Sequence, residues 1–94
     1  MKRSKSDYVI QTVTNALRVL EAFRDKEKIG VTELSRRLGL HKNNVFRLLA
    51  TLQLHGYVEQ RADSDRYGLG GGCLDLGQSF LRSRALLRKE RGRG

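Results

Sequence analysis

The sequence predicts a mainly α-helical domain with one small β-hairpin, followed by a further helix. Three amphipathic stretches with helical periodicity lie between residues 12 and 56. A stretch in which side chains alternate with a period of two follows between residues 57 and 69. Apolar residues with helical spacing return from Cys73 onward. A chain of 94 residues is long enough for one small domain of this kind and too short for a large substrate cleft.

The first helix is predicted to begin after Thr12, whose hydroxyl suits the N-cap position. Its apolar side chains lie on one arc of a helical wheel: Ala16, Leu17, Val19, Leu20 and Phe23. The charged run at residues 24–28 and Gly30 end this helix. Residues 1–7 lack apolar periodicity, so they are predicted to form a disordered basic arm.

A short second helix and a third helix follow in close succession. The second is predicted to start at Thr32 as N-cap and to end at Gly39, which suits the left-handed residue that closes a helix. The third begins at Lys42 and ends at residues 55–56. Two helices joined by a short turn that contains glycine form a helix-turn-helix, here predicted at about residues 30–49.

The alternating stretch predicts two short strands, residues 57–61 and 66–69, joined by a turn at residues 62–65. Two strands alone are marginal in water, so we expect them to pack on the helices as a wing at about residues 57–69. The wing completes a winged helix-turn-helix domain over residues 8–70. Glycines 70–72 break the second strand and predict a flexible joint.

The last helix is predicted within residues 71–87, before a basic tail at residues 88–94. Its apolar residues span about half of the helix circumference, which is more than so small a body could cover. We therefore expect a second copy of the chain to pack on this helix, with Leu76, Phe80 and Leu81 at the contact. Cys73 lies on the same arc, where a small core residue is favoured over a reactive thiol.

The net charge of +9 is concentrated in three blocks. Three basic residues lie within residues 1–5, and six lie within residues 82–94 against one acid, Glu90. Residues 34–58 hold four basic residues and no acid, and this block lies inside the folded region. A surplus placed in this way favours a polyanionic partner over general solubility.

The polar face of the third helix holds the sharpest candidate site. Asn43 and Asn44 near its start match the adenine edge in the major groove, and Arg47 matches guanine or phosphate. Lys42 at the first position is a candidate phosphate contact. The alternative is that both asparagines only cap or solvate the helix start.

Further candidate DNA contacts lie on the second helix and the wing: Thr32, Arg36, Arg61 and Arg66. The two wing arginines flank the turn, where long side chains could reach phosphates or the minor groove. The alternative for the wing is a solvated hairpin with local ion pairs, because Asp63 and Asp65 lie at its tip.

Nothing in the sequence indicates an enzyme. The chain has no phosphate-binding loop and no dinucleotide fingerprint. No cofactor is expected, and a metal site is not predicted from one cysteine and two histidines. The chain also lacks a long apolar run and a secretory signal, so we expect a cytoplasmic location.

Three stretches of the chain resemble the N-terminal DNA-binding domain of IclR-type transcriptional regulators: TVTNALRVLEAF, GVTELSRRLGLHKNNVFRLLATLQLHGYVEQ and YGLGGGCLDLG. The resemblance implies a winged helix-turn-helix with a linker helix that pairs two such domains. It places the recognition-helix positions at Lys42, Asn43, Asn44 and Arg47. The family usually carries a small hydroxyl residue at one or both of the asparagine positions, so a different operator is expected here.

The resemblance also implies a C-terminal domain that senses a small molecule, which nothing after about Arg84 could form. We therefore expect this chain to be an excised or truncated DNA-binding domain, with an effector ligand only in a longer protein. The leading hypothesis is sequence-specific binding of double-stranded DNA, as a homodimer on a palindromic or pseudo-palindromic operator of a bacterial regulator. The alternatives are a protein-interaction module with nonspecific nucleic-acid binding and, less favoured for lack of aromatic residues on the polar face, an RNA-binding winged helix.

Overall fold

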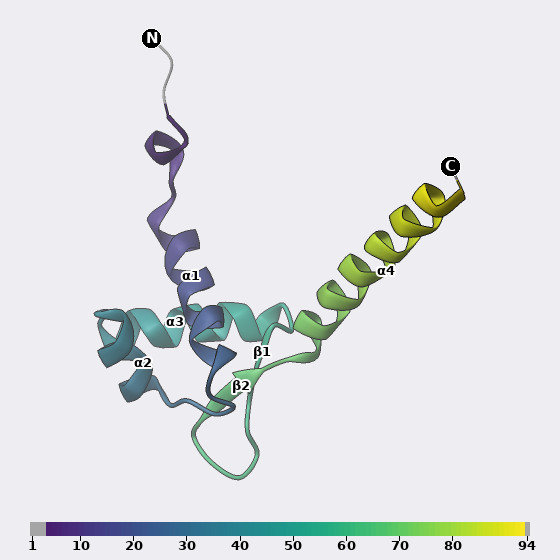
Figure 1. Cartoon of the computed structure of the whole chain (residues 1–94). Coiled ribbons are helices and arrows are strands. Elements are labelled where there is room, and N and C mark those ends of the chain that lie inside the picture. The colour runs from purple at the N-terminus through teal and green to yellow at the C-terminus, as the bar shows by residue number, and fades with distance from the viewer. Residues whose placement is uncertain (1–3, 94) are drawn as a thin grey trace.

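The computed structural model describes residues 4–93, and the side chains of residues 4–85. It is mainly helical with one antiparallel hairpin, as predicted. The elements in chain order are η1 (Lys5–Tyr8), α1 (Gln11–Glu21), η2 (Ala22–Arg24), α2 (Val31–Leu38), α3 (Lys42–Leu54), β1 (Val58–Gln60), β2 (Tyr67–Leu69) and α4 (Gly71–Arg93). The three helices α1 to α3 form the body, while α4 and the segment before α1 extend away from it (Figure 1).

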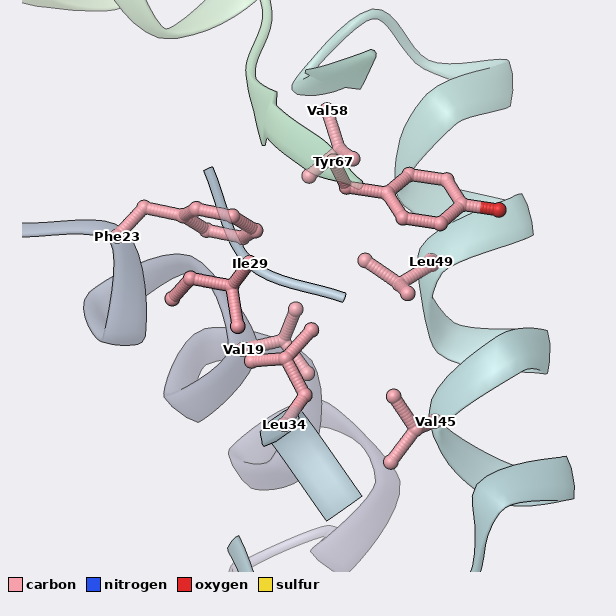
Figure 2. Close-up of a cluster of buried hydrophobic side chains, with 8 residues drawn as sticks. All are labelled: Val19, Phe23, Ile29, Leu34, Val45, Leu49, Val58 and Tyr67. Carbon is pink, nitrogen blue, oxygen red and sulfur yellow. The ribbon is translucent and has the colours of Figure 1, made fainter. Parts of the chain in front are cut away.

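The core is built from eight buried side chains that converge from three helices, the hairpin and two connecting segments (Figure 2). They are Val19, Phe23, Ile29, Leu34, Val45, Leu49, Val58 and Tyr67. Leu17 lies on the apolar arc of α1, but its side chain is 55% exposed and is not part of this core. Only one side of α1 packs on α3, so the outer part of its apolar arc has no neighbour within the body.

Both predicted threonine N-caps are wrong, because each helix begins earlier. The first bond of α1 runs from the Thr14 amide to the Ile10 carbonyl, and that of α2 from the Leu34 amide to the Gly30 carbonyl. Gly30 directly follows a residue held extended by the hairpin, so α2 starts as soon as that pairing ends. Thr32 therefore lies inside the first turn of α2, with its side chain exposed.

The hairpin pairs Val58 with Leu69 and Gln60 with Tyr67. A third segment adds to it: Ile29 forms an antiparallel bridge with Tyr67, with two backbone hydrogen bonds of 2.9 Å. The wing thus packs on the body, as expected, and the bridge in addition ties it to the segment before α2. This attachment explains how so short a hairpin is stable.

The turn between α2 and α3 has the predicted form. Gly39 adopts the left-handed conformation (φ 68°) and its amide donates to the Ser35 carbonyl at 3.0 Å. Three residues separate the two helices, so the helix-turn-helix lies where the sequence predicts it.

The joint between the wing and α4 is packed, so the prediction of a flexible joint is wrong. Gly70 is buried, and α4 begins at Gly71. The Gly72 amide donates to the Gly56 carbonyl at 2.9 Å, and the Gly70 amide donates to the Tyr57 carbonyl at 2.9 Å. A Cβ added at Gly72 would lie 2.8 Å from the Gly56 oxygen. Glycine is needed here because backbones meet closely.

The two ends of the chain are more helical than predicted. Within the arm predicted as disordered, η1 forms a turn that the Ser4 amide stabilises by donating to Asp7 Oδ2 at 3.1 Å; residues 1–3 lie outside the described residues. At the other end, α4 continues beyond residue 87 to Arg93, through the predicted tail. The tail is rich in arginine and lysine, which are good helix formers. Residue 94 and the side chains of residues 86–93 lie outside the described part.

Candidate nucleic-acid interface

The start of α3 presents an exposed polar surface formed by Lys42, Asn43, Asn44 and Arg47. Its N-cap is His41, which makes no side-chain capping bond. Among the described side chains, none forms a hydrogen bond or an ion pair with either asparagine. Neither asparagine caps the helix, and both amide groups are exposed with donors and acceptors free, which fits a base-reading surface and a merely solvated helix start alike.

Two of these residues line a hollow between α3 and α1. The hollow is lined by Thr12, Asn15, Asn44, Arg47, Leu48 and Thr51. Thr12 and Asn15 are parts of this surface that were not predicted from the sequence. Asn15 is held in place by Gln11, whose Nε2 donates to Asn15 Oδ1 at 3.1 Å, and by Arg18 at 3.4 Å. The two residues are three positions apart on α1, which makes them neighbours on the helix surface, and this spacing was the available signal.

A second hollow brings together predicted contacts from α2 and from the wing, two elements that lie far apart in the sequence. It is lined by Gly30, Val31, Thr32, Glu33, Arg36, Asp65 and Arg66. Thr32, Arg36 and Arg66 are all exposed. The first-turn amides of α2 lie at the same place, and a helix N-terminus favours anions. The wing and α2 therefore meet at a surface that holds two arginines and two acids.

The two acids differ in their surroundings. Glu33 accepts from Lys26 Nζ at 2.8 Å and lies 3.4 Å from Arg37 Nε. The hydrogen bond from Lys26 holds the pKa of Glu33 below its ordinary value. Glu33 thus stays charged and is compensated locally, while Asp65 is exposed at the wing tip.

Arg61 lies in neither hollow. Its Nη1 donates to Glu59 Oε1 at 2.7 Å, its guanidinium lies against Gly68, and only 25% of its side chain is exposed. Asp63 at the wing tip pairs with Lys28 at 3.3 Å, and this hydrogen bond lowers the pKa of Asp63. Local ion pairs therefore occupy Arg61 and Asp63 of the wing. Among the described side chains, Arg66 is the basic residue of the wing that forms no ion pair.

The residues predicted for dimerisation are exposed on α4. Leu76, Phe80 and Leu81 are 60%, 57% and 65% exposed. The guanidinium of Arg84 lies 5.2 Å from the centre of the Phe80 ring. A second apolar strip lies on the outer side of α1 and just before it: Ile10, Val13 and Leu17.

Cys73 lies at the base of α4 and is partly buried. Its Sγ donates to the Tyr57 carbonyl at 3.3 Å, and burial raises the pKa of the thiol. Within the described residues, no three His, Cys, Asp or Glu side chains gather where they could hold a metal ion. In that part of the chain, no helix has the length and apolar character needed to cross a membrane.

A comparison with models of protein families identifies the family of the chain. The model of the IclR helix-turn-helix domain matches residues 12–62, which is more than half of the chain. The chain belongs to the IclR family. This IclR domain is 34% identical over 85 residues to the transcriptional regulator XynR of Escherichia coli, covering 89% of this chain and 34% of that protein. It is 37% identical over 84 residues to the glycerol operon regulatory protein of Streptomyces griseus, covering 83% and 33%.

Solved structures of IclR regulators share the fold. One from Silicibacter matches with a TM-score of 0.75 and 36% identity, covering 85% of this chain and 32% of that one. One from Brucella abortus matches with a TM-score of 0.74 and 31% identity, covering 87% and 32%. The IclR domain thus spans about a third of the length of these relatives. The relatives named are transcriptional regulators, which supports DNA-binding regulation as the class of function.

Proposed function

We propose that this chain binds double-stranded DNA at specific sequences by placing α3 in the major groove. The observation that carries the proposal is the exposed start of α3, where Asn43 and Asn44 have free amide groups beside Lys42 and Arg47. Asparagine can make two hydrogen bonds to the adenine edge, and arginine can do the same with guanine. No acid lies within residues 34–58 to repel the DNA backbone.

Backbone contacts come from residues around α3. Lys42 lies at the first position of the helix, where a phosphate passes when the helix N-terminus enters the groove. Thr32, Arg36 and Arg66, which line one hollow with the first turn of α2, form a second phosphate contact. These contacts orient the domain without reading bases. Arg61 is a weaker candidate because it is engaged by Glu59.

The proposed regulator is a homodimer that binds a palindromic or pseudo-palindromic operator. The exposed apolar side chains of α4 support this proposal, because no described element covers them beyond the first turn of the helix. A two-fold dimer would present two α3 helices to two half-sites. DNA as partner also implies a cytoplasmic location in a bacterium.

Selection from a random duplex pool tests the proposal. We expect an enriched sequence with two related half-sites, bound with affinity that falls steeply as salt rises. Asn43→Ala should cost about 1–3 kcal/mol on the selected site and little on random DNA. Gln53→Ala, an exposed polar residue at the far end of the same helix, is the control and should cost little on either. If no sequence is enriched, the protein-interaction module becomes the better hypothesis.

A further inference from the structure

One large apolar side chain on the exposed surface of α3 has no role in the proposed function. Phe46 is 55% exposed, although Val45 before it and Leu49 one turn later are fully buried. It follows Lys42 and Asn43 by four and three residues, so its ring lies next to them on the helix surface. An exposed aromatic ring gains free energy when a partner covers it.

Phe46 is separate from the other exposed apolar surfaces. Ile10, Val13 and Leu17 lie on α1 or just before it, and the remaining exposed leucines and Phe80 lie mainly on α4. The hollow between α1 and α3 includes Asn44 and Arg47 but not Phe46. The ring therefore belongs to the surface that α3 presents outward, together with Asn43.

We propose that Phe46 contacts the 5-methyl group of a thymine and so contributes to the choice of DNA sequence. The inference rests on the proposed function. The thymine methyl is the apolar group that base pairs expose at the edge of the major groove, and phenylalanine is suited to contact it. Lys42 and Arg47 flank the ring on the same exposed surface, and their charge favours a polyanion over an apolar protein surface.

The position of this thymine is constrained by Asn43. Side chains three residues apart on a helix lie about 5–6 Å from each other at Cβ. The thymine should therefore lie within about two base pairs of the base read by Asn43, given the base-pair rise of about 3.4 Å. The half-site then combines an adenine hydrogen-bonded by Asn43 with a thymine methyl under Phe46.

Deoxyuridine substitution tests this contact, because it removes the methyl group and keeps every hydrogen-bonding group of the base. Each thymine of the selected half-site is replaced in turn, and the affinity of the 94-residue chain is measured. We expect a loss of about fourfold at one position, the effect of uncovering about one methyl group. Phe46→Ala should bind the thymine duplex more weakly and should not distinguish it from the uracil duplex at that position. Phe46→Leu should keep part of the discrimination.

Leu54→Ala is the matched control, because Leu54 is an 81% exposed apolar residue at the far end of α3. It should discriminate thymine from uracil as the unsubstituted chain does. If the unsubstituted chain shows no methyl effect, or if Phe46→Ala retains it at every position, the inference is wrong while the proposed function stands. A chain that enriches no sequence at all would overturn both. Far-ultraviolet circular dichroism checks that each variant is folded.

Discussion

Two neighbouring arginines of α2, Arg36 and Arg37, have different contacts. Arg37 donates to the Ala22 carbonyl at 3.3 Å and lies 3.6 Å from Asp25 and 3.4 Å from Glu33. Arg36, its neighbour, is exposed and lines the hollow shared with Arg66. One arginine ties α2 to the segment after α1, and the other is available to a phosphate. Charge counts alone treat the two as equal.

A pair of substitutions separates these roles. Arg36→Ala should leave the free energy of unfolding unchanged, weaken binding to all DNA, and reduce the slope of log affinity against log salt by about one. Arg37→Ala should lower the free energy of unfolding by up to about 1 kcal/mol, because its ion pairs are partly exposed. Urea denaturation and a salt titration of DNA binding measure the two effects. Equal effects of both variants on DNA binding would contradict the assignment.

The thiol of Cys73 should react slowly in the folded chain. Burial raises its pKa, so less thiolate is present at a given pH, and the thiolate is the nucleophile. At pH 8, alkylation by iodoacetamide should be slower in buffer than in urea, and the difference should shrink as the pH rises through the raised pKa. Equal rates in both solvents at pH 8 would show that the thiol is not protected.

At the scale of elements, the joint between the wing and α4 controls where the last helix points. The Gly56 carbonyl accepts the Gly72 amide at 2.9 Å, and Gly56 itself has a left-handed backbone (φ 84°). A Cβ at Gly70 would lie 2.5 Å from the same carbonyl oxygen. The end of α3, the hairpin and the base of α4 therefore meet at one backbone group, which makes the joint a fixed contact.

Alanine substitutions at adjacent glycines test this packing. In Gly72→Ala the new Cβ would lie 2.8 Å from a backbone oxygen, so we expect a loss of about 1–3 kcal/mol in the free energy of unfolding. In Gly71→Ala nothing lies within 4 Å of the new Cβ, and the loss of backbone freedom in the unfolded chain should stabilise the fold by up to about 1 kcal/mol. Thermal denaturation measures the stability of the two variants against that of the unsubstituted chain. Two neutral substitutions would mean that the joint is flexible after all.

At the scale of the whole molecule, the apolar surface is divided between the core and two extensions. The eight core residues hold α1 to α3 and the hairpin together. All described side chains of α4 beyond Cys73 are exposed, as are Ile10 and Val13 near the start of α1. Both α4 and the segment before α1 extend away from the body (Figure 1). An isolated helix is marginally stable in water, so the exposed apolar side chains of α4 favour the proposed packing on a second copy of the chain.

Dimerisation through α4 has a direct test. Leu81→Lys places a charge on the exposed apolar face, so it should shift the chain toward monomer in sedimentation at high concentration, with the core unchanged. Gln78→Lys is the control, because Gln78 lies between Leu76 and Phe80 in the sequence but on another side of the helix, and it should keep the association of the unsubstituted chain. Monomeric sedimentation of the unsubstituted chain, with and without selected DNA, would count against the dimer.

Local patterns were enough to predict the fold class and the position of the helix-turn-helix. Helical periodicity, Gly39 after α2 and the alternation of the hairpin are local signals, because each depends on neighbours a few residues away. The start of α3 at Lys42 was also predictable from local signals, and it fixes the asparagines near the exposed beginning of this helix. The base-reading roles of these residues remain predictions.

Only the tertiary structure decided which side chains of each pattern are covered and which polar groups meet. Leu17 fits the apolar arc of α1 but lies outside the core, and Arg61 resembles Arg66 in sequence but is engaged by Glu59. The Ile29 bridge set the start of α2, and the Gly56 carbonyl turned a glycine run into a packed joint. Burial and pairing depend on contacts between residues far apart in the chain, and helical period, turn chemistry and charge do not encode those contacts.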